Sequence, residues 1–156
     1  MAKYDDASWH YGGDFPEDLE NEAGATHIGM FITWCINNNL VSEFQMDEAG
    51  DDVQKVKDRL MTGTEFLISN CDEKFTDEDL NEVGNQFANA YYNEDTQFAK
   101  SFAPYLQDYS HCFEQRAIDN KKAFKSVYHV KDSWENYALI EAVIDKRFGE
   151  WKKIQL

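Results

Sequence analysis

The stretch from Tyr4 to Trp34 gathers the side chains of this chain that are best suited to chemistry. It holds two Trp, two His and two Tyr, together with several carboxylates and glycines. Imidazoles and carboxylates can move protons or bind metal ions, while aromatic faces stack on ligands and glycines let a backbone approach them closely. The stretch matches no catalytic signature of defined spacing. These residues therefore form either a functional surface or a packed edge of the core.

The four histidines do not predict a metal site. They are His10, His27, His111 and His129, and none stands in the His-x-x-x-His or Glu-x-x-His spacing that places two ligands on one helix face. His27 and Asp14 can still meet in the folded chain, but a histidine near a helix start is more often packed or hydrogen-bonded. The sequence therefore predicts no metal ligand and no cofactor.

Nucleophilic catalysis has no strong candidate either. The chain lacks a Gly-x-Ser-x-Gly elbow, and Cys35 lies in the most apolar helical run, where a thiol is inert. Nothing in the sequence makes Cys71 or Cys112 reactive. Three widely spaced cysteines fit reduced thiols in a cytoplasm better than a disulfide framework. We therefore expect no catalytic residues, a protein that is not an enzyme, and a cytoplasmic location.

The charge of the chain is strongly negative and unevenly placed. The formal net charge is −15, and the first 52 residues contribute −11 of it, from twelve acidic residues and a single base, Lys3. Nucleic acids and anionic membranes are bound through clustered Lys and Arg, so neither is an expected partner. A negative surface speeds encounter with a basic protein, although high net charge also serves solubility.

We expect a partner-binding surface that combines the aromatic loop with the acidic groups around it. Aromatic side chains supply contact energy in such surfaces, and acids steer the partner. The acids lack the ligand spacing of an EF-hand loop, and the alternative for them is an ordinary solvated surface. The predicted partner-binding residues are Trp9, His10, Tyr11, Asp14, Glu17, Asp18, Glu20, Glu22, Asp47, Glu48, Asp51 and Asp52.

Apolar spacing predicts a mainly α protein that forms a single compact helical domain over residues 1–156. Residues 1–25 carry turn formers and no helical period, which predicts an irregular N-terminal segment. The run 27–38 is apolar on most of its circumference and is expected to be the central helix. Five or six helices are expected in all, the others over residues 53–61, 64–70, 76–91, 94–109 and 133–153. Within 94–109, Pro104 is expected to introduce a kink or a boundary.

One short β pairing is also expected. Residues 126–130, Ser-Val-Tyr-His-Val, are β-prone, and we expect them to pair with part of the N-terminal stretch. The N-terminus lacks the apolar core of a signal peptide, and no window is apolar enough for a membrane span.

Several motifs along the chain carry a family resemblance. They are Tyr4–Tyr11, Gly13–Pro16, Ala25–Phe31 with Trp34, Met61–Gly63, Lys74–Asn81, Ala90–Tyr92, Tyr128–Val130, and Asp145 with Arg147, Phe148 and Trp151. Through them the chain resembles an uncharacterised family of small soluble bacterial proteins, a domain of unknown function. The resemblance implies no catalytic roles. Small acidic bacterial proteins are often immunity proteins of toxin systems, which is an analogy between families.

Two functional hypotheses follow. The first is a cytoplasmic immunity protein that neutralises a cognate, basic toxin by binding and occluding its active surface. The alternative is a small-molecule-binding domain or enzyme whose pocket is lined by Trp9, His10, Asp14, His27 and Tyr128.

Overall fold

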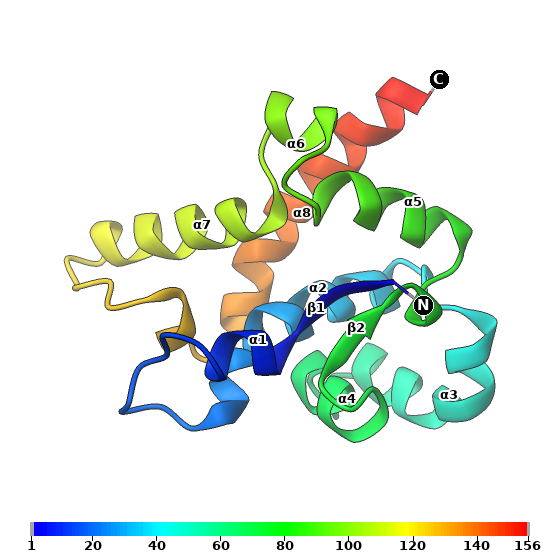
Figure 1. Ribbon diagram of the computed structural model, residues 1–156, viewed down its shortest axis with the longest axis horizontal. Helices are drawn as coiled ribbons and strands as arrows, with labels where there is room; N and C mark the ends of the chain where they lie inside the picture. The colour runs from blue at the N-terminus through cyan, green and yellow to red at the C-terminus, as the bar shows by residue number, and fades with distance from the viewer. Residues whose placement is uncertain (1, 156) are drawn as a thin grey trace.

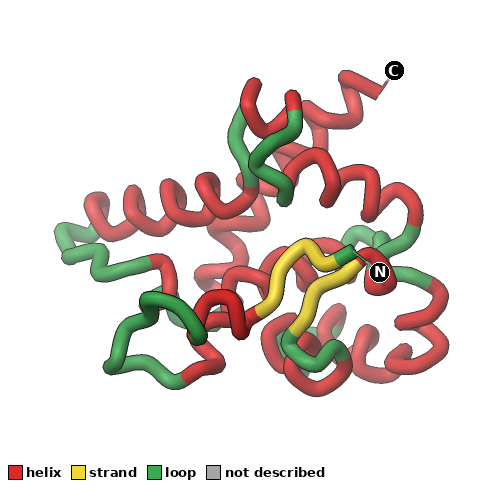
Figure 2. Tube along the Cα trace, viewed as in Figure 1, coloured by secondary structure: helices red, strands yellow, loops and turns green. Residues whose placement is uncertain are grey.

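The computed structural model describes residues 2–155 and shows a mainly α protein with one small antiparallel sheet (Figures 1 and 2). This confirms the predicted fold class. Within that range the strands are β1 (Lys3–Asp6) and β2 (Lys74–Thr76). The 3₁₀ turns are η1 (Asn21–Gly24), η2 (Asp77–Asp79) and η3 (Val127–His129). The α-helices are α1 (Ala7–Tyr11), α2 (Thr26–Asn37), α3 (Glu43–Lys57), α4 (Gly63–Asn70), α5 (Glu82–Tyr91), α6 (Gln97–Ser101), α7 (Tyr105–Asp119) and α8 (Trp134–Gln155).

Helix α2 is the centre of the core, as its composition predicts. Every residue from Thr26 to Ile36 is buried. The ring of Phe31 lies in the middle of an aromatic cluster that joins α2 to β2, α5 and α7, and whose other members are Trp34, Phe75, Phe87, Tyr91, Tyr92 and Tyr105. Since aromatic rings bury large areas, this cluster dominates the packing of the fold.

Two glycines allow α2 and α4 to pack at backbone contact. A Cβ atom on Gly29 would lie 2.5 Å from the Cα of Thr64, and one on Gly63 would lie 2.9 Å from the carbonyl carbon of Gly29. Both distances are far below ordinary van der Waals contact. Side chains at these two positions would force the helices apart.

Polar contacts tie α2 to the C-terminal half of the chain. The indole Nε1 of Trp34 donates to Asp145 of α8 at 2.8 Å, and the Tyr105 hydroxyl of α7 donates to the carbonyl oxygen of His27 at 2.6 Å. Helix α8 crosses behind the other elements in Figure 1 and packs on α2, α5 and α7. The hydrogen bond from Tyr105 holds the first turn of α2, which carries His27, and the bond from Trp34 holds the end of the helix.

The β pairing exists, but the predicted pairing segment is wrong. Strand β1 pairs antiparallel with β2, whereas residues 126–130 form the turn η3. The Ser126 hydroxyl accepts a hydrogen bond from the backbone N–H of Tyr128 at 3.1 Å and lies 2.7 Å from His129 Nδ1. This local capping satisfies backbone groups inside the turn and competes with a strand.

The N-terminal segment is more ordered than predicted. Its first residues form β1, and the Asp6 side chain then caps α1 by accepting from the backbone N–H of Ser8. The prediction of an irregular segment holds for residues 12–20, which form only turns and bends.

Predicted helix boundaries differ at the start of α5 and at the end of α7. Thr76 is a cap, as its sequence suggests, but it caps only η2, because Leu80 is extended and forms a bridge with Val41; α5 begins after Asn81. The boundary expected at Pro104 is confirmed, since Pro104 is the N-cap of α7, but α7 continues to Asp119, well beyond the predicted end at residue 109. A proline at this position cannot continue the preceding helix.

Candidate functional site

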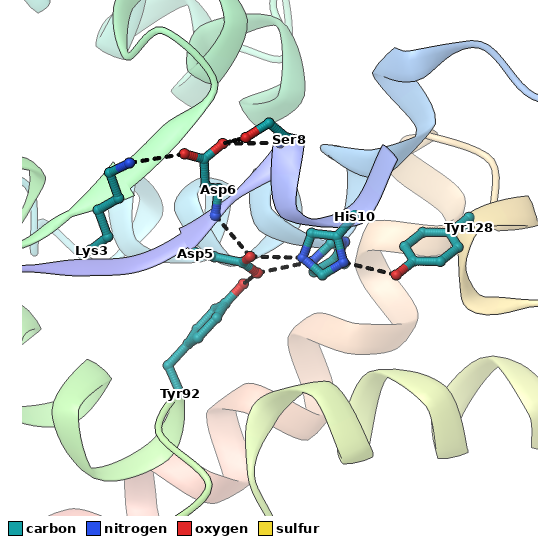
Figure 3. A network of polar contacts seen from close by, with 8 residues as sticks. Lys3, Asp5, Asp6, Ser8, His10, Tyr92 and Tyr128 are labelled. Atoms are coloured by element: carbon teal, nitrogen blue, oxygen red, sulfur yellow. Dashed lines mark hydrogen bonds and ion pairs between the residues drawn. The ribbon is translucent and has the colours of Figure 1, made fainter. Parts of the chain in front are cut away.

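The cap of α1 places His10. The Asp6 carboxylate accepts from the backbone N–H of Ser8 at 2.9 Å and from its hydroxyl at 2.7 Å, and it forms an ion pair with Lys3 at 3.1 Å (Figure 3). A capping carboxylate satisfies free N–H groups at a helix start and so fixes where the helix begins. One turn later, His10 points back toward the end of β1, where Asp5 lies.

His27 reaches the same point from the first turn of α2. Its side chain is buried, and its Nε2 atom lies 3.0 Å from Asp5 Oδ2. The Nε2 atom of His10 lies 2.7 Å from Asp5 Oδ1 and 3.2 Å from His27 Nε2. One carboxylate therefore faces two imidazole nitrogens that also face each other. We call Asp5, His10 and His27 the Asp-His-His cluster.

Two tyrosines and a backbone group surround this cluster. Tyr92, which follows α5, donates from its hydroxyl to Asp5 Oδ2 at 2.5 Å, and the backbone N–H of Asp6 donates to Asp5 Oδ1 at 2.8 Å. The hydroxyl of Tyr128 in η3 lies 2.8 Å from His10 Nδ1 (Figure 3). Segments far apart in the sequence thus converge on a single buried carboxylate.

The surroundings decide the charge of each group. Burial acts to raise the pKa of Asp5, but hydrogen bonds from His10 and His27 outweigh it and hold that pKa well below its ordinary value. Burial lowers the pKa of His27 despite its contact with Asp5. Burial raises the pKa of Tyr92 well above its ordinary value, so its hydroxyl stays protonated and donates. The cluster therefore pairs an ionised carboxylate with a neutral His27 imidazole at neutral pH.

The Asp-His-His cluster can bind a cation or hold a proton. Each of its residues offers one ligand atom, and these atoms all lie within 4.8 Å of one another. Carboxylate oxygen and imidazole nitrogen are ordinary ligands of divalent transition metals. No other group of this kind is found among residues 2–155.

Sequence reasoning found part of this site and missed its centre. Of the five residues predicted to line a pocket, His10, His27 and Tyr128 come together, whereas Asp14 is exposed and Trp9 is 56% exposed. Asp5 and Tyr92 were not predicted. Asp5 looks like one acid among twelve in an acidic region, and no spacing relates it to positions 27 and 92.

Most of the predicted partner-binding residues lie at the surface. His10 and Tyr11 are partly buried, and the Tyr11 hydroxyl donates to Glu73 at 3.0 Å, which ties α1 to the turn before β2. Asp52 is also partly buried. The exposed members are Trp9, Asp14, Glu17, Asp18, Glu20, Glu22, Asp47, Glu48 and Asp51.

The loop that carries four of these acids is fixed to η3. Asp18 forms an ion pair with His129 at 3.0 Å, and the ring of Phe15 packs on that of Tyr128 with centroids 4.9 Å apart. The hydrogen bond from His129 lowers the pKa of Asp18. Residues 12–20 therefore lie over the Tyr128 side of the Asp-His-His cluster.

Helix α4 connects the two acidic groups that the sequence separates. Glu22 of η1 lines one surface hollow together with Glu65 and Ile68 of α4. Asn70, at the end of α4, lines a second hollow with the acidic residues of α3. In Figure 1, α4 lies between α1 and α3. We call this surface the acidic face; its residues are Glu22, Glu65, Ile68, Asn70, Met46, Asp47, Glu48, Asp51 and Asp52.

Exposed apolar side chains accompany the acids of α3. Phe44 is 55% exposed and Met46 is 46% exposed, and both belong to the helix that carries Asp47 and Glu48. The base Lys131 lines the hollow beside Glu22. Large apolar side chains rimmed by charge are characteristic of interaction surfaces.

Comparison with known proteins gives one family match. Residues 3–130 match the model of a family described as "Domain of unknown function (DUF7832)". Searches of curated proteins and of solved structures each found no match. No helix within residues 2–155 has the length and apolarity that crossing a membrane requires.

Proposed function

The chain belongs to the DUF7832 family, and from its surface we propose that it acts by binding a basic protein partner through the acidic face. The observation that carries this proposal is that α4 lines both acidic hollows. Charges that are distant in the sequence, at Glu22 and at Asp47–Asp52, lie on either side of α4.

The chemistry of the face supports recognition as well as attraction. Exposed acids raise the rate of encounter with a cationic protein, and apolar side chains such as Phe44 and Met46 can fill pockets of the partner once docked. Trp9 of α1, which is not part of the acidic face, is also exposed, and Lys3 lies 5.8 Å from the centre of its ring. Charge thus provides steering while the apolar side chains provide contact.

The specific form that we propose is a cytoplasmic immunity protein that occludes the active surface of a cognate toxin. A toxin that acts on nucleic acid presents clustered Lys and Arg to phosphate groups. An acidic face would compete for that surface. The formal net charge of −15 supports this assignment, because it repels nucleic acid and favours the cationic protein instead.

A binding experiment with the products of neighbouring genes tests the proposal. Each product is purified separately, and its association with the DUF7832 protein is measured at increasing ionic strength. We expect one product to bind at a rate that falls steeply with salt, and its toxicity in cells to be relieved by co-expression. If no neighbouring product binds, the immunity function is refuted.

Charge-reversal variants locate the interface. Asp47→Lys with Asp51→Lys should lower the association rate, and Glu22→Lys with Glu65→Lys should do the same if the partner spans α4. Glu114→Lys with Asp119→Lys is the matched control, because both residues are exposed acids of α7 outside the acidic face. Equal losses in all three variants would reduce the effect to overall charge and would contradict a defined face.

A further inference from the structure

We propose that the Asp-His-His cluster is a binding site for a divalent transition-metal ion, with Zn²⁺ as the first candidate. The ligands would be one carboxylate oxygen of Asp5 and the Nε2 atoms of His10 and His27. This site is separate from the acidic face, so it adds to the proposed function and does not depend on it.

The spacing of the two imidazole nitrogens matches the needs of such an ion. The two Nε2 atoms are 3.2 Å apart, and each lies 2.7 or 3.0 Å from an oxygen of Asp5. With metal–ligand distances of about 2.0–2.2 Å, two ligands on one ion are separated by about 2.9 Å at octahedral angles and about 3.4 Å at tetrahedral angles. The nitrogen–nitrogen distance falls within that interval.

Hydrogen bonding alone explains the arrangement of these three side chains less well than a bound metal ion does. If both Nε2 atoms carry protons, they donate to Asp5, but two N–H dipoles then lie side by side with their nitrogens 3.2 Å apart. If either nitrogen lacks its proton, its lone pair faces a carboxylate oxygen. A dication removes both conflicts, because all three lone pairs then point at one positive charge.

The surrounding groups orient the ligands as metal sites require. The contact between His10 Nδ1 and the Tyr128 hydroxyl leaves Nε2 of His10 to face the cluster. Tyr92 and the backbone N–H of Asp6 hold the Asp5 carboxylate in place. Such outer partners fix tautomer and direction, and losing one commonly weakens metal binding by about 10–100-fold.

The cluster is partly exposed to solvent on the His10 side. The His10 side chain keeps 15% of its surface exposed, whereas Asp5 and His27 are almost completely buried. Tyr128, which contacts His10, lines the hollow beside Glu22. With three protein ligands, the ion would keep at least one position for water or another small ligand, as zinc does in its open sites.

Metal titration of tag-free protein tests this proposal. The protein is treated with a chelator, dialysed, and titrated with Zn²⁺ by calorimetry; Co²⁺ and Cu²⁺ then serve as spectroscopic probes. We expect one ion per chain, visible Co²⁺ absorption bands, and Cu²⁺ resonance signals split by two imidazole nitrogens. The wild-type spectra need no variant, so they test the ligand set even if some substitutions impair folding.

Substitutions then identify the ligands. Asp5→Asn, His10→Gln and His27→Gln should each weaken Zn²⁺ binding by more than about 100-fold, and Tyr128→Phe by about 10–100-fold. His111→Gln is the control, because His111 is exposed on α7 and should leave affinity unchanged. Circular dichroism of each metal-free variant checks its folding.

Three outcomes would overturn the site. One is the absence of stoichiometric binding by all three metals. Another is Cu²⁺ coupling to fewer than two nitrogens. The last is an equal loss of affinity in His111→Gln, which would indicate adventitious surface binding only.

Discussion

Substituting Gly29 by alanine should destabilise the protein, although alanine is the better helix former. Gly29 lies inside α2, where its contact with α4 sets the position of the helix that connects the two halves of the acidic face. The same helix, α2, carries His27 of the Asp-His-His cluster. One close approach of two backbones therefore positions both proposed sites.

The magnitude follows from the contact that the new methyl group would make. Its carbon would lie 2.5 Å from the Cα of Thr64, whereas carbon atoms normally approach to about 3.5–4.0 Å. The obstacle is backbone, so α4 must move by about 1 Å. Overpacking of a core costs about 1–3 kcal/mol, and the upper end applies where backbone must shift. The higher helix propensity of alanine offsets about 1 kcal/mol of this cost, so the free energy of unfolding should fall by about 2 kcal/mol.

Thermal unfolding measures this loss against a matched control. For a chain of this size, about 2 kcal/mol lowers Tm by about 4–8 °C. Gly149→Ala is the control, because a Cβ atom on Gly149 in α8 meets nothing within 4 Å. There alanine should stabilise by about 0.5–1 kcal/mol and raise Tm by about 1–4 °C.

The outcome that would refute this reasoning is a Gly29→Ala protein that melts at or above the wild-type temperature. The backbones of α2 and α4 would then lie farther apart than described. Thr64→Ala should not rescue the variant, because the clash involves the backbone of Thr64 as well as its side chain.

Three further predictions concern single contacts. Arg147→Met should lower the free energy of unfolding by about 3–5 kcal/mol, because it leaves the buried Asp108 without its bidentate partner. Urea denaturation measures this free energy, and a decrease of less than about 1 kcal/mol would contradict the prediction. Thr62→Ala should cost about 0.5–2 kcal/mol in the same assay, since Thr62 forms the capping box of α4. NMR titration should place the pKa of Asp18 below 3.8. His129→Gln should raise this pKa toward 3.8, because the variant loses the hydrogen bond that favours the ionised carboxylate. If the pKa of Asp18 does not change in the variant, residues 12–20 do not lie on η3.

Helix identity was predictable wherever the local pattern agreed with the packing. Residues 27–38 are apolar around most of the helix, and this property alone requires burial, so the central position of α2 followed from the sequence. Boundaries were less predictable. Thr62 and Thr64 both precede Phe66, and sequence favours Thr64 as the cap, yet Thr62 caps α4 and Thr64 is buried against Gly29. Packing between two helices made that choice.

The candidate sites too were predictable in their composition but not in their spatial arrangement. The acidic N-terminal third and its aromatic side chains were evident from composition, because charge and side-chain type do not depend on the fold. That both acidic groups lie beside α4 was not evident, because only folding brings Glu22 and the acids of α3 next to the same helix.

The sequence by itself determined a mainly α protein, the central place of α2 and the strongly negative surface, since periodicity, apolarity and charge are local properties. Only the tertiary structure decided that Asp5, one acid among many, is buried between two histidines and a tyrosine. The stretch from Tyr4 to Trp34 supplies three of those residues, but the pairing of β1 with β2 and the packing of α5 and α7 on α2 bring them together. A site built from positions 5, 10, 27, 92 and 128 leaves no periodic signal, because its geometry is set by contacts between elements.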